Sequence, residues 1–146
     1  MSINAAQLRD AVVQQINQAG LTPSLTAIPI YDLSVDLESL KGGRIVVMPQ
    51  TKSLEPIRRK GDQAATYTID VAVQFKGADI KPATLDPYLS LAEQIGDLSL
   101  GTTLKTQIVP AATCIEVIWP HGLFIQKHLE DFRCLTSVVS LKIKVN

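Results

Sequence analysis

A regular alternation of apolar and polar residues between Thr66 and Lys76 is the feature that most constrains the fold of this chain. Because successive side chains on a strand point to opposite sides, the segment TYTIDVAVQFK predicts a strand with one buried and one solvated face. Such a strand needs neighbours on both edges and an apolar layer over its buried face. The apolar positions are Tyr67, Ile69, Val71, Val73 and Phe75.

Two amphipathic helices are expected to supply that layer. The first begins after Asn4, a favourable N-cap, with Gln7 three residues later as in a capping box. Gly20 is placed to end this helix in the left-handed conformation. The second is expected to run from Asp86-Pro87 to about Asp97, with Asp86 as its N-cap and Pro87 as its first helical residue.

Further strands are expected on both sides of the 66–76 segment. A hairpin over residues 33–48 is indicated by apolar alternation, a Lys-Gly-Gly turn and a β-branched run, with Pro29 before the first strand or on a sheet edge. We expect Pro49 to end this hairpin and residues 50–65 to form a long loop.

The second half of the chain is predicted to add strands over residues 113–119 and 139–145. The last strand ends with two outward lysines, which suits a pairing element or a protected edge. Lys142 and Lys144 are the candidate edge-strand contacts. Residues 124–132 are either another extended arm or a short helix.

Taken together, these elements predict one α+β domain over residues 1–146, with a mixed, mostly antiparallel sheet and two helices packed on one face. The chain has 146 residues, of which 46% are hydrophobic and 19% are charged, as is typical of a folded globular protein. Residues 99–110 show no periodicity that assigns them to a helix or a strand.

Charge and hydropathy disfavour several classes of protein. Fourteen basic and fourteen acidic residues cancel, so strong nucleic-acid or anionic-membrane binding is not expected. No apolar run approaches the roughly 18 residues of a membrane span, and the first residues do not follow the signal-peptide pattern. The protein is therefore expected to be made in a cytoplasm.

Cys114 and Cys134 lie in apolar surroundings and are expected to be buried thiols in a reducing compartment, in preference to a disulfide. With His121 and His128 they are the only soft ligands of the chain. The ligands of zinc sites lie in pairs that are closer in the sequence than any two of these four residues. Neither a metal nor another cofactor is therefore expected.

Four acidic residues are candidates for a solvated or lumen-facing sheet surface. Asp32, Asp36 and Glu38 share the polar side of the expected first strand, and Asp70 lies on the polar side of the 66–76 strand. Acid–base catalysis by paired carboxylates needs one of them buried, which the pattern does not indicate. The chain also contains no nucleophile elbow and no phosphate loop, so we expect no enzymatic activity.

A short basic run, Arg58, Arg59 and Lys60, lies in the expected long loop. It is either a solvated loop tip or a contact arm that reaches an acidic neighbour or a phosphate backbone.

The order of these elements resembles that of the tail terminator proteins of long-tailed bacteriophages, which complete the tail and join it to the head. The segments that carry the resemblance cover nearly the whole chain. They are AAQLRDAVVQQINQAG, LSVDL, RIVVMP with the loop after it, YTIDVAVQF, LDPYLSLAEQI and VVSLKIKVN.

The resemblance implies a structural virion protein located in the tail or neck and assembled in the host cytoplasm. Its subunits would form a hexameric ring that caps the tail tube and docks to the neck or head-completion protein. DNA would pass through the lumen without specific binding, and no membrane would be involved. Another neck or baseplate ring subunit, or a small non-enzymatic binding module, remains the alternative.

Overall fold

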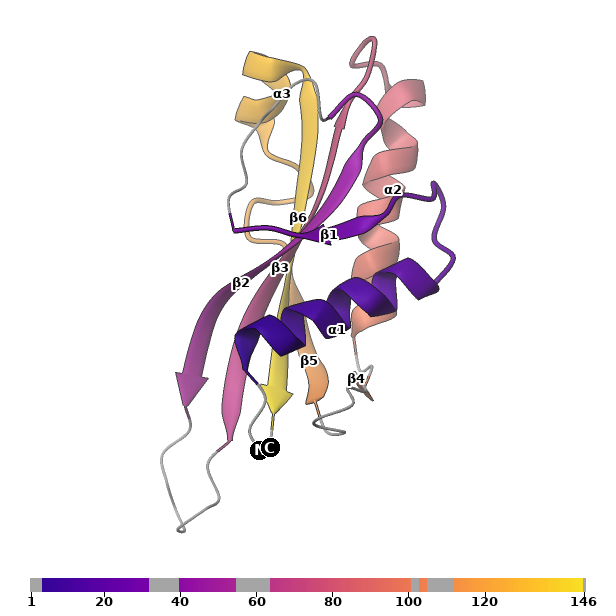
Figure 1. Ribbon diagram of the computed structural model, residues 1–146. Helices are drawn as coiled ribbons and strands as arrows, with labels where there is room; N and C mark the ends of the chain where they lie inside the picture. Colours follow the sequence, from indigo (N-terminus) through magenta and orange to yellow (C-terminus); the bar gives the residue numbers. More distant parts are fainter. Residues whose placement is uncertain (1–3, 32–39, 55–63, 101–102, 105–111, 146) are drawn as a thin grey trace.

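The computed structural model describes residues 4–31, 40–54, 64–100, 103–104 and 112–145. In this part of the chain it shows an α+β fold with a mixed, mostly antiparallel sheet, as the sequence predicts (Figure 1). The elements are α1 (Ala5–Gln18), β1 (Ala27–Pro29), β2 (Arg44–Leu54), β3 (Ala65–Lys76), α2 (Pro82–Ser99), β4 (Thr103–Leu104), β5 (Ala112–Ile118), α3 (Gln126–Phe132) and β6 (Cys134–Val145).

The sheet has the strand order β1-β2-β3-β6-β5-β4. Among the described strands β1 and β2 pair in parallel, and the other neighbouring pairs are antiparallel. The strand predicted at residues 66–76 is β3, and it lies inside the sheet, paired with β2 over residues 65–74 on one edge and with β6 over its whole length on the other. β3 and β6 are therefore the centre of the fold.

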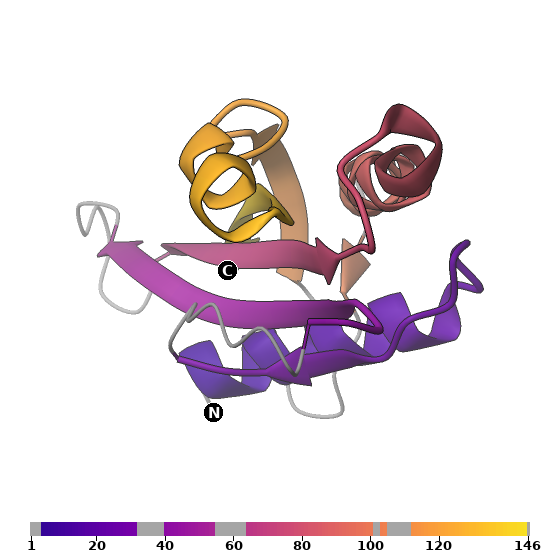
Figure 2. The ribbon, with the colours of Figure 1, turned by 90° about the horizontal axis from the view of Figure 1, so that it is seen from above.

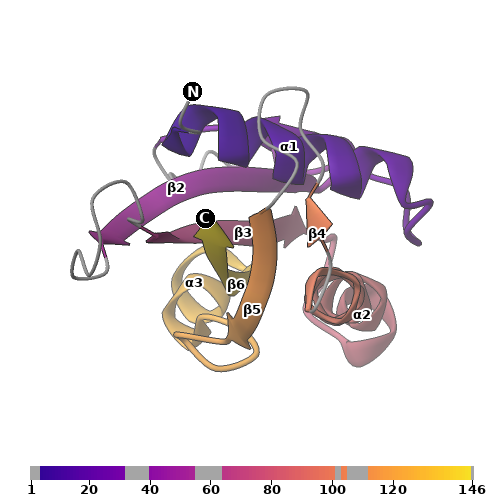
Figure 3. The same cartoon turned by 90° about the horizontal axis from the view of Figure 1, so that it is seen from below.

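Two helices cover one face of the sheet and a third lies on the other. Figure 2 shows α1 and α3 on opposite sides of β2 and β3, and Figure 3 shows α2 and α3 on opposite sides of β5. Residues from α1 and α2 share one apolar cluster with the odd-numbered residues of β3, here called the inner face. The even-numbered residues of β3 lie on the outer face, where Ile125 beside α3 packs on Val46, Ala72 and Val138.

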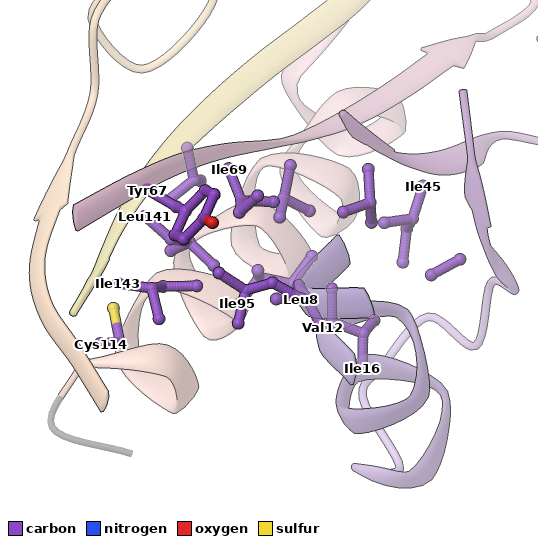
Figure 4. Packing of buried hydrophobic residues seen from close by; sticks show 14 of the residues in the cluster. Leu8, Val12, Ile16, Ile45, Tyr67, Ile69, Ile95, Cys114, Leu141 and Ile143 are labelled. Carbon is purple, nitrogen blue, oxygen red and sulfur yellow. The ribbon is translucent and has the colours of Figure 1, made fainter. Parts of the chain in front are cut away.

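The inner-face core follows from the alternation in the sequence. Leu8, Val12 and Ile16 of α1 recur at helical spacing and pack with Ile95 of α2 over the strands (Figure 4). Their sheet partners come from every second position of each strand, so one register puts all of them on one side. These partners include Ile45, Tyr67, Ile69, Cys114, Leu141 and Ile143.

The ends of α1 agree with the sequence analysis. The Asn4 side chain accepts a hydrogen bond from the Gln7 N–H, and the Gln7 side chain accepts one from the Asn4 N–H, each at 2.9 Å. This is the expected capping box. Gly20 after the helix has a φ of 67°, the left-handed conformation that favours glycine.

The predicted start of α2 at Asp86-Pro87 is wrong. The helix begins at Pro82, after the N-cap Lys81, and Pro87 lies inside it. The Asp79 carboxylate accepts hydrogen bonds from the Thr84 hydroxyl and the Lys81 N–H, which fixes the chain at the earlier proline. Both prolines satisfy the same rule for the first helical position, and the local hydrogen bonds of Asp79 favour the first one.

Pro49 does not end the strand that precedes it. β2 continues to Leu54 through a bulge between Pro49 and Thr51, so residues 50–54 belong to the sheet and not to a loop. Proline is tolerated here because this part of β2 lies at an edge and the bulge needs no ladder bond from it. The expected first strand at residues 33–37 lies outside the described residues. β1, which ends at Pro29, lies beside β2, and the described part of the sheet continues no further on that side.

The structure assigns one segment that the sequence left open and two residues of the other, residues 99–110, of which 101–102 and 105–110 lie outside the described residues. Residues 126–132 form the short helix α3 and not an extended arm, and Thr103–Leu104 form the two-residue strand β4. None of the helices in the described ranges is long and apolar enough to cross a bilayer.

Candidate functional site

Asp70 is the one candidate lumen acid that the structure describes. It lies half-buried on the outer face and accepts a hydrogen bond of 2.5 Å from the Ser140 hydroxyl of the neighbouring strand β6. Burial raises the pKa of the Asp70 carboxyl above its ordinary value, and the Ser140 hydrogen bond and the charge of His121 oppose this rise. Asp70 is thus a partly desolvated group held by its neighbours.

Two groups of predicted site residues lie outside the described residues. This applies to the acids Asp32, Asp36 and Glu38 and to the basic run Arg58, Arg59 and Lys60.

The prediction that Lys142 and Lys144 belong to an edge strand is wrong. They lie on β6, which pairs with β3 on one side and with β5 on the other. The Lys142 ammonium forms an ion pair of 3.4 Å with Glu116 across the β5–β6 pair. The C-terminal strand β6 is internal because β5, which precedes it in the sequence, pairs with the side of β6 that does not face β3.

The four soft ligands do not come together. Cys114 is in the inner-face core, where it pairs with Ile143, whereas Cys134 begins β6 on the outer face. The nine residues from Cys134 to Ile143 span about 30 Å of strand, too far for a disulfide. Both thiols are free and buried, and burial raises the pKa of each. In the described residues no group of three potential ligands is placed to hold a metal ion.

A polar chain lies between α3 and the outer face. The His128 Nδ1 and the Thr136 hydroxyl are 2.9 Å apart, and the Cys134 sulfur is 3.7 Å from the same hydroxyl. Burial is the main reason why the pKa of His128 lies below its ordinary value. Since Cys134 and Thr136 are fully buried, these groups hold α3 to the sheet and offer no accessible nucleophile.

The described edge of β1 is blocked against further pairing. The Asn17 side chain donates to the Ala27 C=O at 3.3 Å and accepts from the Ala27 N–H at 2.7 Å. Pro29, two residues further, has no N–H to offer. These are two recognised ways of protecting a sheet edge, and together they leave little of β1 for a neighbouring chain.

The distal part of β2 is an edge that the described residues do not cover. Because the described β1 pairs with Ile45–Val47, the residues of β2 after Met48 have β3 on one side and no described strand on the other. The backbone of Val47 faces β1, as its bond from the Ile30 N–H shows. Alternation across the bulge then turns the N–H and C=O of Lys52 and Leu54 outward, where they have no described hydrogen-bond partner.

A second open segment lies near the other end of the sheet. β4 pairs only with Ala112 and Thr113 of β5, so residues 114–118 have β6 on one side and no further strand in the described part of the chain. The same alternation turns the backbone of Val117 outward. Ile115 sits at a bulge in β5 and is 52% exposed.

Sequence reasoning missed both open segments. The sequence pattern predicted that the edge strand lies at residues 139–145. It also predicted that the strand beginning at Arg44 ends at Pro49. The available signal was the TKSL run after Pro49, in which threonine and leucine suit a strand, but strand order decides which edges stay open.

Comparison of the chain with models of known protein families gives no match, and a search of curated proteins finds no relative. The site therefore has to be interpreted from its own geometry and chemistry.

Proposed function

We propose that this protein is a structural subunit of a phage tail that assembles into a ring, and that the ring caps the tail tube as a tail terminator. It would join the tube to the neck or head-completion protein. The likeness of the chain layout to tail terminators, described above, specifies the particle. The geometry of the sheet supplies the physical support for a ring.

The observation that carries the proposal is that β2 and β5 each have a segment with no strand beside it on one side in the part of the chain that the structure describes. They are different surfaces, separated by β3 and β6 in the strand order. A contact between two different patches of identical subunits is heterologous, and repeated contacts of this kind generate a ring or a filament. A dimer, by contrast, uses one patch twice.

The element layout also agrees with the segments on which the resemblance rests. The opening amphipathic helix, the strand of the RIVVM run, the central alternating strand, the helix after it and the closing strand are all present as α1, β2, β3, α2 and β6. The LSVDL segment lies outside the described residues. This agreement supports the same architecture without testing the family.

In this proposal DNA passes through the ring without being bound. The equal numbers of acidic and basic residues suit that role, because a strongly basic wall would retain the phosphate backbone. Asp70 and the three acids Asp32, Asp36 and Glu38 are the proposed lumen residues. Replacing Asp32, Asp36 and Glu38 with lysine, and leaving the half-buried Asp70 in place, is expected to leave assembly intact and to slow DNA passage, measured as a loss of infectious particles.

The experiment that tests the proposal combines native mass spectrometry of the untagged protein with electron microscopy of its mixture with assembled tail tubes. A closed oligomer, hexameric by expectation, that binds one end of the tube would support a terminator. A ring that binds no tube but binds a neck or baseplate component would favour another ring subunit of the particle. A monomer with and without tubes would contradict the proposal and favour a small binding module.

A further inference from the structure

We propose that neighbouring subunits join by β-sheet extension, in which the distal part of β2 (residues 51–54) in one copy pairs antiparallel with the open segment of β5 (residues 115–118) in the next. This inference rests on the proposed ring and names its subunit contact. The partner is a second copy of this chain, and the contact consists first of backbone hydrogen bonds.

Strand direction permits this pairing. β2 runs antiparallel to β3, β3 to β6, and β6 to β5, so β2 and β5 run in opposite directions within one subunit. When a second copy continues the sheet in the same orientation, its β2 lies antiparallel to the β5 that it joins. Antiparallel edges pair with straight, perpendicular hydrogen bonds, and the two segments are of equal length.

Backbone polarity selects the residues that bond. Lys52 and Leu54 turn their N–H and C=O groups outward from β2, and Val117 does so from β5. Setting Lys52 of one copy opposite Val117 of the next brings these outward groups together. The same register sets Leu54 opposite Ile115 and Ser53 opposite Glu116.

The faces of the two segments also match in this register. Lys52 pairs with the inner-face residue Tyr67 in its own subunit, and Val117 pairs with the inner-face residue Leu141. Ser53 and Glu116 pair with Thr66 and Lys142, which are on the outer face. The inner and outer faces would therefore continue from one subunit to the next. A register shifted by one residue would instead turn every side chain to the opposite face.

Exposed apolar side chains mark both segments. Leu54 is 53% exposed and Ile115 is 52% exposed, and they are opposite each other in the proposed register. Cross-strand apolar pairs of this kind stabilise a sheet and lose water-exposed area when they form. A large exposed side chain on each open segment favours a partner strand over solvent.

The outer edge of β1 does not compete in the described residues. Asn17 occupies the outward N–H and C=O of Ala27, and Pro29 lacks an N–H. β1 is thus closed to pairing, while β2 beyond Met48 and β5 beyond Thr113 have no further strand beside them in the described ranges. This asymmetry directs assembly to the β2–β5 contact.

Disulfide cross-linking between copies tests the register. Ser53 and Glu116 would form a non-hydrogen-bonded pair with close Cα atoms, a geometry that suits a disulfide. The variant carrying Ser53→Cys and Glu116→Cys is expected to give a ladder of covalent oligomers under mild oxidation, ending at the ring size. Each single-cysteine variant is a control, because it forms covalent dimers if a segment pairs with the same segment of another copy.

The matched control is Lys52→Cys with Glu116→Cys, which places the thiols on opposite faces one residue out of register. This double variant is expected to give no ladder of covalent oligomers. A ladder of equal yield from this control, or covalent dimers from a single variant with no higher oligomer in the double variant, would overturn the proposal. Native Cys114 and Cys134 are buried and are expected to stay out of the reaction.

A backbone substitution tests the hydrogen bonds themselves. Lys52→Pro removes an outward N–H that has no described partner, so the subunit is expected to fold and to lose ring formation. Lys52→Ala keeps the N–H and removes only the side chain, including its contact of 5.4 Å with the Tyr67 ring, and is expected to form rings. Circular dichroism checks that both variants fold.

The two proposals fail in different ways. If the unmodified protein forms rings and the Ser53–Glu116 variant gives no ladder, the β2–β5 contact is wrong and the ring remains. If folded Lys52→Pro protein still forms rings, the contact is again wrong. If the unmodified protein forms no closed oligomer alone or on tubes, the proposed function itself fails.

Discussion

The side-chain amide of Asn17 pairs with the backbone of Ala27 through two hydrogen bonds, of 2.7 Å and 3.3 Å, as another strand would. The pair ties α1 to β1 and closes the outer edge of that strand. It is made by a residue at the exposed end of a helix, where its side chain would otherwise be solvated.

We expect Asn17→Ala to lower the free energy of unfolding by about 1 kcal/mol, because the loss of two hydrogen bonds outweighs the better helix propensity of alanine. Urea denaturation followed by circular dichroism measures this change. Gln14→Ala, at another exposed position of α1, is the control and is expected to be neutral or slightly stabilising. Equal stabilities of the two variants would show that the Asn17–Ala27 pair contributes nothing.

Gly77 is the second position with a sharp prediction, because a Cβ atom there would lie 2.6 Å from the Thr84 Cγ2 and 3.0 Å from the Asp79 backbone oxygen. Gly77→Ala is expected to destabilise the fold by about 1–3 kcal/mol through this overlap. Gly42→Ala is the matched control, since its Cβ would meet no atom within 4 Å, and its effect should stay within about 0.5 kcal/mol. Thermal unfolding of both variants provides the comparison.

The Asp70 carboxyl predicts a pH dependence of stability. Its pKa in the folded protein is raised above the ordinary value of 3.8, mainly by burial, so the folded state binds this proton more tightly than the unfolded state does. The resulting stabilisation is complete below pH 3.8 and is lost as pH rises through the folded-state pKa.

Asp70→Asn removes this titration and keeps an oxygen that can accept the Ser140 hydrogen bond. The melting temperature of the variant relative to the unmodified protein is therefore expected to rise by a few degrees between pH 4 and pH 7. Ser140→Ala, which removes the hydrogen bond alone, is the control. A variant that becomes less stable relative to the unmodified protein over this range would mean that the Ser140 and His121 interactions outweigh burial.

Thiol accessibility tests the placement of the two cysteines. Cys114 and Cys134 are 2% and 0% exposed, and burial raises the pKa of both thiols. Labelling with a thiol reagent is expected to be slow in the folded protein and complete, at two groups per chain, in denaturant. Mild oxidation should leave the mass of the folded protein unchanged. Formation of an intramolecular disulfide without unfolding would contradict the separation of about 30 Å along β6.

The sequence by itself determined the features that depend on local periodicity and on end signals. The two-residue period of residues 66–76 and 139–145 identified β3 and β6, and the capping box of Asn4 and Gln7 located the start of α1. These features are readable because each residue's face or backbone bond depends only on neighbours a few positions away.

Only the tertiary structure decided strand order, and with it the edges. β6 carries lysines that suit an edge, yet it lies inside because β5 pairs beyond it. β2 passes Pro49 because a bulge there leaves the ladder with β3 intact. Pairing between strands distant in sequence depends on how whole elements pack, which no short window records. For the same reason the open segments of β2 and β5, on which the proposed ring depends, became visible only in the folded chain.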